Sequence, residues 1–178
     1  MRARVIALTA AVVGAGLLVP QSAPAAAGHG RLIVYSLLKY DVTSKDRGYL
    51  GDGDIHLVHA DGTGDRALTS DSADDYEPAF SPSGQLIAFS SDRSDTNSRV
   101  TDVWVMRTDG TGLRRLTHGL DTGGPTFSPN GQWVLFTVAG ADGRSPASMR
   151  MVSIDGQRTK LVLRMNHGHY YAADWDPR

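Results

Sequence analysis

Short runs of apolar and β-branched residues recur along the chain, separated by polar turns. Three of them, Leu32–Ser36, Leu86–Ser90 and Trp133–Thr137, end in an aromatic residue followed by a small hydroxyl residue. The chain after residue 27 shows no apolar spacing of about 3.6 residues, the period that marks an amphipathic helix. These runs therefore predict β-strands.

Two kinds of turn accompany these runs at fixed spacing. Ser-Pro-x-Gly precedes the second and third runs, where Pro presets φ and Gly accepts a positive φ, so each predicts a tight hairpin. Asp-Gly ends a second set of strands, Asp54–Ala60, Asp102–Thr108 and Ser148–Ile154, and is a strong hairpin signal. The residues that mark the repeat are Phe80, Pro82, Gly84, Phe127, Pro129, Gly131, Trp175, Pro177, Asp61, Gly62, Asp109, Gly110, Asp155 and Gly156.

The repeat has a period of about 47 residues. Phe80 returns as Phe127 after 47 residues and as Trp175 after a further 48. Units of 40–50 residues with four short strands are typical of β-propeller blades. The sequence therefore predicts an all-β fold, a partial propeller of three four-stranded antiparallel blades. A β-sandwich would not explain why the turn chemistry returns at every fourth strand.

Residues 78–117 resemble a known repeat. They read Pro-x-Phe-Ser-Pro-x-Gly, Ala-Phe-Ser-Ser, Asp-Arg, Asp-Val-Trp-Val-Met, Asp-Gly-Thr and Leu-Thr, which is similar to the TolB-type WD-repeat-like propeller repeat. The third unit departs from this pattern, with Ala139-Gly140 in place of Asp92-Arg93 and Ser148 in place of the aspartate that begins the strand. The resemblance implies that the Phe-Ser-Pro strand is innermost in each blade and that a complete ring has six blades.

If the Phe-Ser-Pro strand is the inner strand, the first predicted strand of the chain is the second strand of a blade. The last predicted strand, Ala172–Pro177, is then an inner strand without the rest of its blade. Propellers run from about four blades upward, so three blades do not close a ring. We therefore predict a two-fold homodimer, in which each C-terminal strand enters the first blade of the partner. An open arc and a fragment of a longer propeller are the alternatives.

The first 27 residues predict a secretory signal peptide. Arg2 and Arg4 precede the apolar run Val5–Val19, and Ala25–Ala27 supplies small residues for cleavage. An uncleaved anchor is the alternative, although the apolar run is short for a membrane span. Residues 28–178 would form the propeller domain, secreted or otherwise extracytoplasmic (periplasmic or cell wall), with no stable membrane span after cleavage.

The composition of the chain limits which classes of partner we expect. The chain has no cysteine, so no disulfide framework is available. Without Arg2 and Arg4 the net charge is about −3, which disfavours a phosphate-binding surface and hence a nucleic-acid partner. We expect no cofactor and no metal. We also expect Asp92-Arg93 and Asp102 to form an ion pair in the second unit.

The candidate binding residues lie in two segments. One is the long polar stretch 39–53, which we expect to be a loop; the other precedes the last strand. His167 and His169 would share one face of an extended segment with Asp174 near them, which leaves a metal site as an alternative. The candidate contact residues are Tyr40, Lys45, Arg47, Tyr49, His167, His169 and Tyr170.

The function that fits these features is a secreted, non-enzymatic scaffold. It would bind a protein, a peptide or a cell-envelope ligand through its loops, because function in such folds lies on loops. The alternatives are a propeller-type hydrolase, with or without a metal, the accessory domain of a secreted peptidase, or a remnant without a function of its own. Ser81 and Ser128 precede proline in the turns, and no Gly-x-Ser-x-Gly motif makes either a nucleophile.

Overall fold

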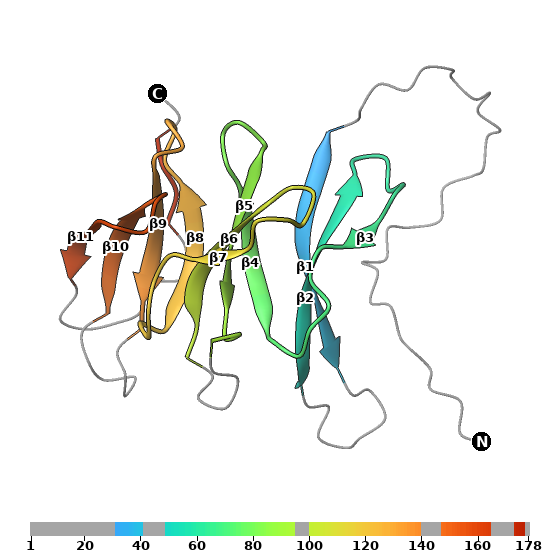
Figure 1. Cartoon of the computed structure of the whole chain (residues 1–178), viewed down its shortest axis with the longest axis horizontal. Helices are drawn as coiled ribbons and strands as arrows, with labels where there is room; N and C mark the ends of the chain where they lie inside the picture. The colour runs from blue at the N-terminus through green and yellow to red at the C-terminus, as the bar shows by residue number, and fades with distance from the viewer. Residues whose placement is uncertain (1–30, 41–48, 95–99, 140–146, 165–172, 177–178) are drawn as a thin grey trace.

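The computed structural model describes residues 31–40, 49–94, 100–139, 147–164 and 173–176. These residues form three antiparallel sheets and contain no helix (Figure 1). The strands are β1 (Leu32–Tyr40), β2 (Tyr49–His59), β3 (Arg66–Ala67), β4 (Asp75–Phe80), β5 (Leu86–Ser91), β6 (Asp102–Arg107), β7 (Arg114–Arg115), β8 (Thr122–Phe127), β9 (Trp133–Val138), β10 (Ser148–Ser153) and β11 (Thr159–Arg164).

Each sheet is one blade. Blade one has the strand order β1-β2-β3, blade two β4-β5-β6-β7 and blade three β8-β9-β10-β11. The predicted all-β propeller architecture is confirmed. Blades two and three are four-stranded, whereas blade one has three described strands because no described segment lies in the place of an inner strand. The Phe-Ser-Pro strand is the first strand of blades two and three, as the resemblance implied.

The blades share one strand register. Ile33 pairs with Val58 in blade one, and Ile87 pairs with Met106 at the same point of blade two. In blade three the corresponding pair is formed by Val134 of β9 and Val152 of β10. Because side chains alternate between the two faces of a strand, an equal register sends equivalent residues to equivalent faces. Positions can therefore be compared directly from blade to blade.

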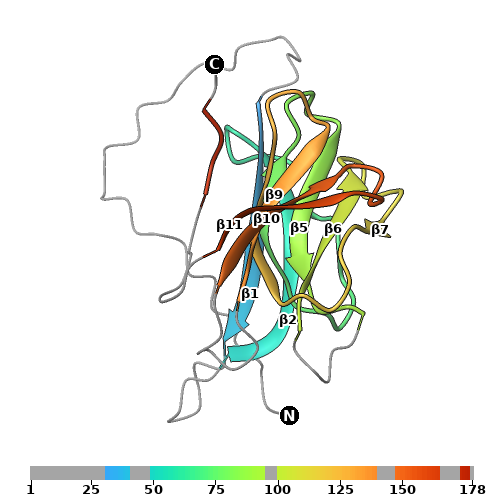
Figure 2. The same ribbon diagram turned by 90° about the vertical axis from the view of Figure 1, so that its left-hand side faces the viewer.

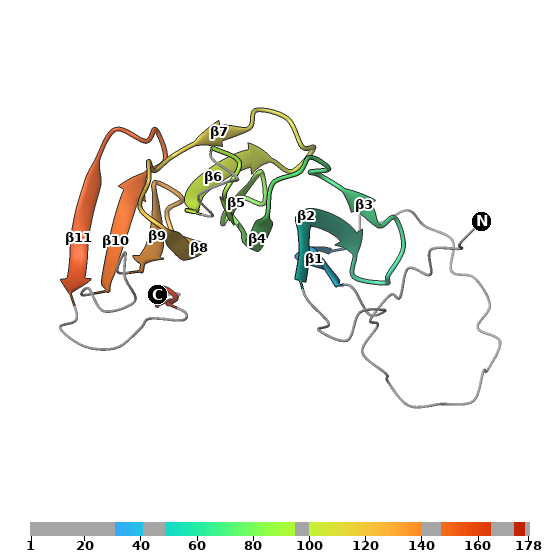
Figure 3. The same cartoon turned by 90° about the horizontal axis from the view of Figure 1, so that it is seen from below.

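The blades stand side by side in an arc, with β4 and β8 toward the concave side (Figure 3). Apolar side chains between the blades form the core. Ile55, Ile87 and Phe89 are fully buried between blades one and two. Val103 and Phe136 are fully buried between blades two and three. The stability of the arc therefore depends on contacts between blades, as in other repeat proteins.

The predicted turn residues form the hairpins. Gly84 and Gly131 have φ angles of 69° and 67°. In the Asp-Gly turns the aspartate side chain accepts backbone and hydroxyl hydrogen bonds: Thr111 donates to Asp109 Oδ1 from its N–H at 2.8 Å and from its hydroxyl at 2.6 Å. These hydrogen bonds lower the pKa of Asp109, and the matching bonds that Thr63 donates to Asp61 lower the pKa of Asp61.

Two local predictions were wrong. The stretch 39–53 is not all loop, since β1 continues to Tyr40 and β2 begins at Tyr49. Arg93 does not pair with Asp102. Its guanidinium binds Asp71 at 2.8 Å and also Asp75, because blade packing turns it toward blade one. Residues 1–27 lie outside the described part, in which no helix is long and apolar enough to span a membrane.

Candidate functional site

Most of the predicted contact residues lie in segments that the structure does not describe. Lys45, Arg47, His167, His169 and Tyr170 belong to this group. The other two, Tyr40 and Tyr49, pair through their backbones at the end of the β1–β2 ladder. The structure does not describe their side chains. Across the described ranges, no three His, Asp or Glu side chains gather in a way that could hold a metal ion.

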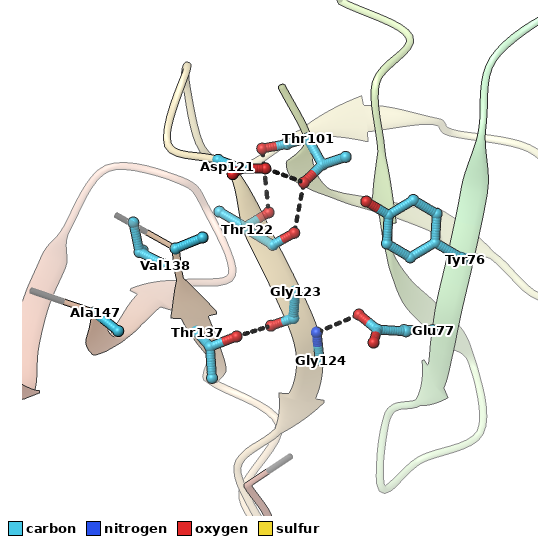
Figure 4. A pocket seen from close by; sticks show the side chains of 11 residues that line it. Tyr76, Glu77, Thr101, Asp121, Thr122, Gly123, Gly124, Thr137, Val138 and Ala147 are labelled. Carbon is cyan, nitrogen blue, oxygen red and sulfur yellow. Dashed lines mark hydrogen bonds between the residues drawn. The ribbon is translucent and has the colours of Figure 1, made fainter. Parts of the chain in front are cut away.

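The structure instead shows a cleft of about 200 Å³ between blades two and three (Figure 4). It lies where the first half of β4 faces the first half of β8. Six of its residues carry side chains that can bind a polar ligand group: a tyrosine, a glutamate, an aspartate and three threonines. The lining residues are Tyr76, Glu77, Thr101, Asp121, Thr122, Gly123, Gly124, Thr137, Val138, Ala139 and Ala147.

The Glu77 carboxylate is positioned by a β-bulge. Between Tyr76 and Ala79 the β4–β5 register shifts, and Glu77 takes a φ of 55°. Blade three has the same bulge, with Gly124 at the equivalent position and a φ of 56°. Glu77 Oε2 accepts a hydrogen bond from the Gly124 N–H at 2.6 Å, so the carboxylate bridges the two bulges.

Gly123 makes room for this bridge. A Cβ at this position would come within 3.2 Å of Glu77 Oε2 and 3.5 Å of Thr137 Oγ1. The Thr137 hydroxyl donates to the Gly123 carbonyl at 3.0 Å and closes the other wall of the cleft. The glycine pair at the start of β8 is therefore matched to the glutamate of the neighbouring blade.

A second carboxylate stands at the upper end of the cleft. Asp121 also has a positive φ, 50°, although it is not a glycine. The Thr101 hydroxyl lies 3.4 Å from Asp121 Oδ1 and donates to the Thr122 carbonyl at 2.6 Å (Figure 4). Tyr76 points toward the same group, and its burial raises the pKa of its phenol, opposed by a hydrogen bond with Thr101. Left-handed backbone at two non-glycine residues of one cleft is typical of functional sites.

The side chains that line the cleft offer mainly hydrogen-bond acceptors. Its lining contains two carboxylates, three threonine hydroxyls and a tyrosine, and none of its eleven residues is Lys, Arg or His. A group that carries a positive charge and several N–H donors would complement it best. Tyr76, Glu77 and Asp121 are not among the residues predicted from the sequence. A comparison of the repeats position by position shows Tyr76-Glu77 where Gly123-Gly124 stands one unit later.

The backbone strain at Glu77 can be measured by comparing two substitutions at this position. We expect Glu77→Ala to lose the bond to Gly124 and keep the strained φ, and Glu77→Gly to lose the bond but relieve the strain. The glycine variant should then be the more stable by about 1 kcal/mol, since L-residues cost about 1–2 kcal/mol in this region. In an ordinary strand the order is reversed. Urea unfolding of both variants checks the sign; an alanine variant that is the more stable would contradict the bulge geometry.

Other buried carboxylates of the described blades serve the fold. Asp102, fully buried, accepts hydrogen bonds from Thr117 Oγ1 at 2.9 Å and from Gly119 N at 3.1 Å, and it pairs with Arg115. Burial raises the pKa of Asp75, and the Arg93 guanidinium opposes this shift. Each arginine is held by its carboxylate, so neither pair is a site for an external ligand.

A third polar group lies at the free end of blade one. The Tyr35 hydroxyl donates to Asp65 Oδ1 at 2.8 Å, and His56 Nδ1 is 3.2 Å from the same oxygen. Desolvation and then the bond to Asp65 raise the pKa of Tyr35 to about 12. Asp65 is itself exposed, and the cleft between blades two and three does not include these residues, so we do not regard this group as a ligand site.

Comparison with known proteins identifies the repeat. No family model matches the chain. The Tol-Pal system protein TolB of Gluconobacter oxydans is 37% identical over 105 residues, which are 57% of this chain and 22% of that protein. The chain therefore spans about a fifth of the length of this relative.

Solved structures share the fold. TolB from Acinetobacter baumannii matches with a TM-score of 0.55 at 18% identity, over 72% of this chain and 29% of that one. An oligogalacturonate lyase in complex with manganese matches with a TM-score of 0.54 at 13% identity, over 75% of this chain and 39% of that one. Propellers of this shape therefore include enzymes, so the fold alone does not decide between catalysis and binding. Together with the sequence match to TolB, the shared architecture identifies the repeats of this chain as TolB-type β-propeller repeats.

Proposed function

We propose that this protein is an extracytoplasmic, non-enzymatic scaffold that binds a protein or peptide of the cell envelope. The observation that carries the proposal is the cleft between blades two and three, with Glu77 and Asp121 in its wall and no cationic side chain among its lining residues. In this proposal it receives a lysine or arginine side chain of the ligand. The segments that contain Lys45, Arg47, His167 and His169 would extend the contact surface in this proposal.

Two further observations support the location and the class of ligand. The matched relative is named for the Tol-Pal system, which makes a protein partner in the envelope the natural expectation. Residues 1–27 have the layout of a signal peptide, which agrees with export. Most of the residues that line the cleft, Glu77 among them, lie on strands, which favours a cleft that is preformed before a ligand arrives.

The test uses a matched pair of peptides, acetyl-Ala-Arg-Ala-amide and the same peptide with citrulline, which is uncharged, in place of arginine. We expect the arginine peptide to shift the backbone NMR signals of Thr101 and Gly123–Gly124 at millimolar concentration, and the citrulline peptide to have at least a tenfold weaker effect. Glu77→Gln with Asp121→Asn should abolish the difference, and Gln85→Ala, on the exposed turn before β5, should not. Equal effects of the two peptides would contradict the proposal.

We also propose that two copies pair to close the ring. Apolar side chains at the free end of blade one are exposed, among them Ile33 at 48% and Leu32 at 41%. The outer strand of blade three exposes Leu161, Val162 and Leu163 in the same way. Apolar surface of this kind at both ends of an arc favours association. Light scattering on the exported, purified protein should give twice the chain mass; a monomer at micromolar concentration would contradict it.

The enzymatic alternative predicts something different. A metal-dependent hydrolase would purify with stoichiometric metal, and a chelator would alter its stability. We expect neither result from elemental analysis and from thermal unfolding with and without EDTA. A metal bound one to one would overturn the non-enzymatic reading and direct attention to His167 and His169.

A further inference from the structure

We propose that the segment 173–176 of one copy is the inner strand of blade one of a second copy, so that the two chains share a composite four-stranded blade. This inference rests on the proposed pairing of two copies and specifies its contact.

The receiving edge is the edge of β1. In blades two and three, β5 and β9 are flanked on the concave side by β4 and β8. In blade one, β1 is the equivalent of β5, and no described strand pairs with its concave edge. β1 is nine residues long, and an edge of this length readily pairs with another chain.

The segment to be inserted already lies where a fourth inner strand would be. Asp174 Oδ1 accepts a hydrogen bond from the Thr126 hydroxyl of β8 at 3.2 Å, across 48 residues. The Glu77–Gly124 bond links the neighbouring inner strands across 47 residues. The segment therefore stands beside β8 much as β8 stands beside β4, on the concave side of the arc (Figure 3). It has the place of an inner strand and, in the described structure, no sheet to join.

Apolar side chains at the two ends of the arc are more exposed than the side chains at equivalent positions inside it. Ile33 is 48% exposed, whereas Ile87 and Val134, which occupy its position in the other blades, are fully buried. At the opposite end Met149 and Met151 are partly exposed, and their equivalents in blade two, Val103 and Val105, are buried. Figure 2, with β10 and β11 in front, looks onto this second end. A copy that follows in the ring would cover both sets.

The repeat fixes the register of the composite blade. Phe80 pairs with Ile87 and Ala79 with Ala88 in blade two. Phe127 pairs with Val134 and Thr126 with Leu135 in blade three. Trp175 and Asp174 follow Phe127 and Thr126 by one period, and Ile33 and Val34 are the equivalents of Val134 and Leu135. Trp175 should therefore lie opposite Ile33 of the second copy, and Asp174 opposite Val34.

One copy does not make this pair with itself. The segment 173–176 lies next to blade three, and β1 belongs to blade one at the other end of the arc (Figure 3). Blade two stands between them, joined to both neighbours by buried apolar clusters. Pairing within a chain would require the arc to break one of these clusters. A second copy needs no such change, so it is the occupant that the geometry favours.

The natural absence of cysteine allows a direct test. Val34→Cys and Asp174→Cys are made in separate copies with different affinity tags, co-expressed and oxidised. Directly opposed residues in a ladder are about 4.5–5.5 Å apart at Cα, within the range that a disulfide spans. We expect a covalent dimer that carries both tags. Asp174→Cys with Gln85→Cys, an exposed residue of blade two, should give at least tenfold less.

The outcomes separate this inference from the proposals on which it rests. A dimeric mass without the Val34–Asp174 cross-link overturns the composite blade and leaves pairing in another form. A cross-link within one copy of a Val34→Cys, Asp174→Cys double variant, with a monomeric mass, overturns both the pairing and the shared blade. As a second readout, Trp175→Asp should lower the dimer fraction at least tenfold while leaving the response to the arginine peptide unchanged.

Discussion

Replacing Asp102 with alanine is expected to lower the free energy of unfolding by about 3–5 kcal/mol, the range seen when one partner of a buried ion pair is removed. Asp102 is fully buried, and its carboxylate accepts bonds from Thr117, Gly119 and Arg115. Thr117 Oγ1 in turn accepts from the Val103 N–H at 2.9 Å. Without the carboxylate, the buried Thr117 hydroxyl loses its acceptor. The Arg115 guanidinium, which is 26% exposed, loses its charge partner and keeps the bond from Nε to the Thr117 carbonyl at 2.7 Å.

Chemical denaturation of the purified protein measures this loss. The matched control is Ser148→Ala, at the equivalent place in blade three, where a serine accepts one bond from Arg150 at 3.2 Å. That change should cost about 1 kcal/mol, because it removes a single bond between side chains. A second variant, Asp102→Ala with Arg115→Leu, removes both charges and should recover part of the loss. Equal effects of Asp102→Ala and Ser148→Ala would contradict the central role of this carboxylate in blade two.

The sequence was sufficient to predict the repeat, and the repeat was sufficient to predict the propeller fold. Gly84 and Gly131 lie at equivalent turns, one repeat apart, and both take the positive φ that this turn position requires. The Phe-Ser-Pro strand was expected to be the inner strand, and β4 and β8 lie at that edge of blades two and three. This succeeded because tight turns depend on local chemistry, which a single sequence displays directly.

Contacts between blades were harder to predict. Arg93 was assigned to Asp102, close to it in the repeat, but it reaches Asp71 and Asp75 because its guanidinium stacks over Phe89 and Trp104. The cleft was missed for a related reason. Glu77 lies one unit away from Gly124 in sequence, and only the packing of two blades brings its carboxylate to that N–H.

The long strands of blade one are a second departure. β1 and β2 extend beyond the repeat to Tyr40 and Tyr49, with register shifts near Lys39. The sequence there is polar and contains Gly51 and Gly53, which suggested a loop. A hairpin whose two arms continue an established ladder gains one backbone bond after another, and this gain overrides weak strand propensity.

One position repeated in all three blades gives the sharpest test of how the arc is held together. Phe89 and Phe136 are fully buried between neighbouring blades, and Tyr35 has the same place at the free end of blade one, partly exposed. Phe89→Ala and Phe136→Ala should each lower the free energy of unfolding by about 3–5 kcal/mol, from lost burial and the cavity left behind.

Tyr35→Ala should cost a single copy about 1 kcal/mol, since the ring is half covered and its hydroxyl bond to Asp65 is exposed. In a closed ring the same side chain would meet the next copy, so the variant should instead raise the dissociation constant of the dimer. Denaturation at two protein concentrations, with light scattering on each variant, separates the two effects. If Tyr35→Ala were as destabilising as Phe89→Ala and independent of concentration, blade one would be buried against its own chain, and the arc would not need a second copy.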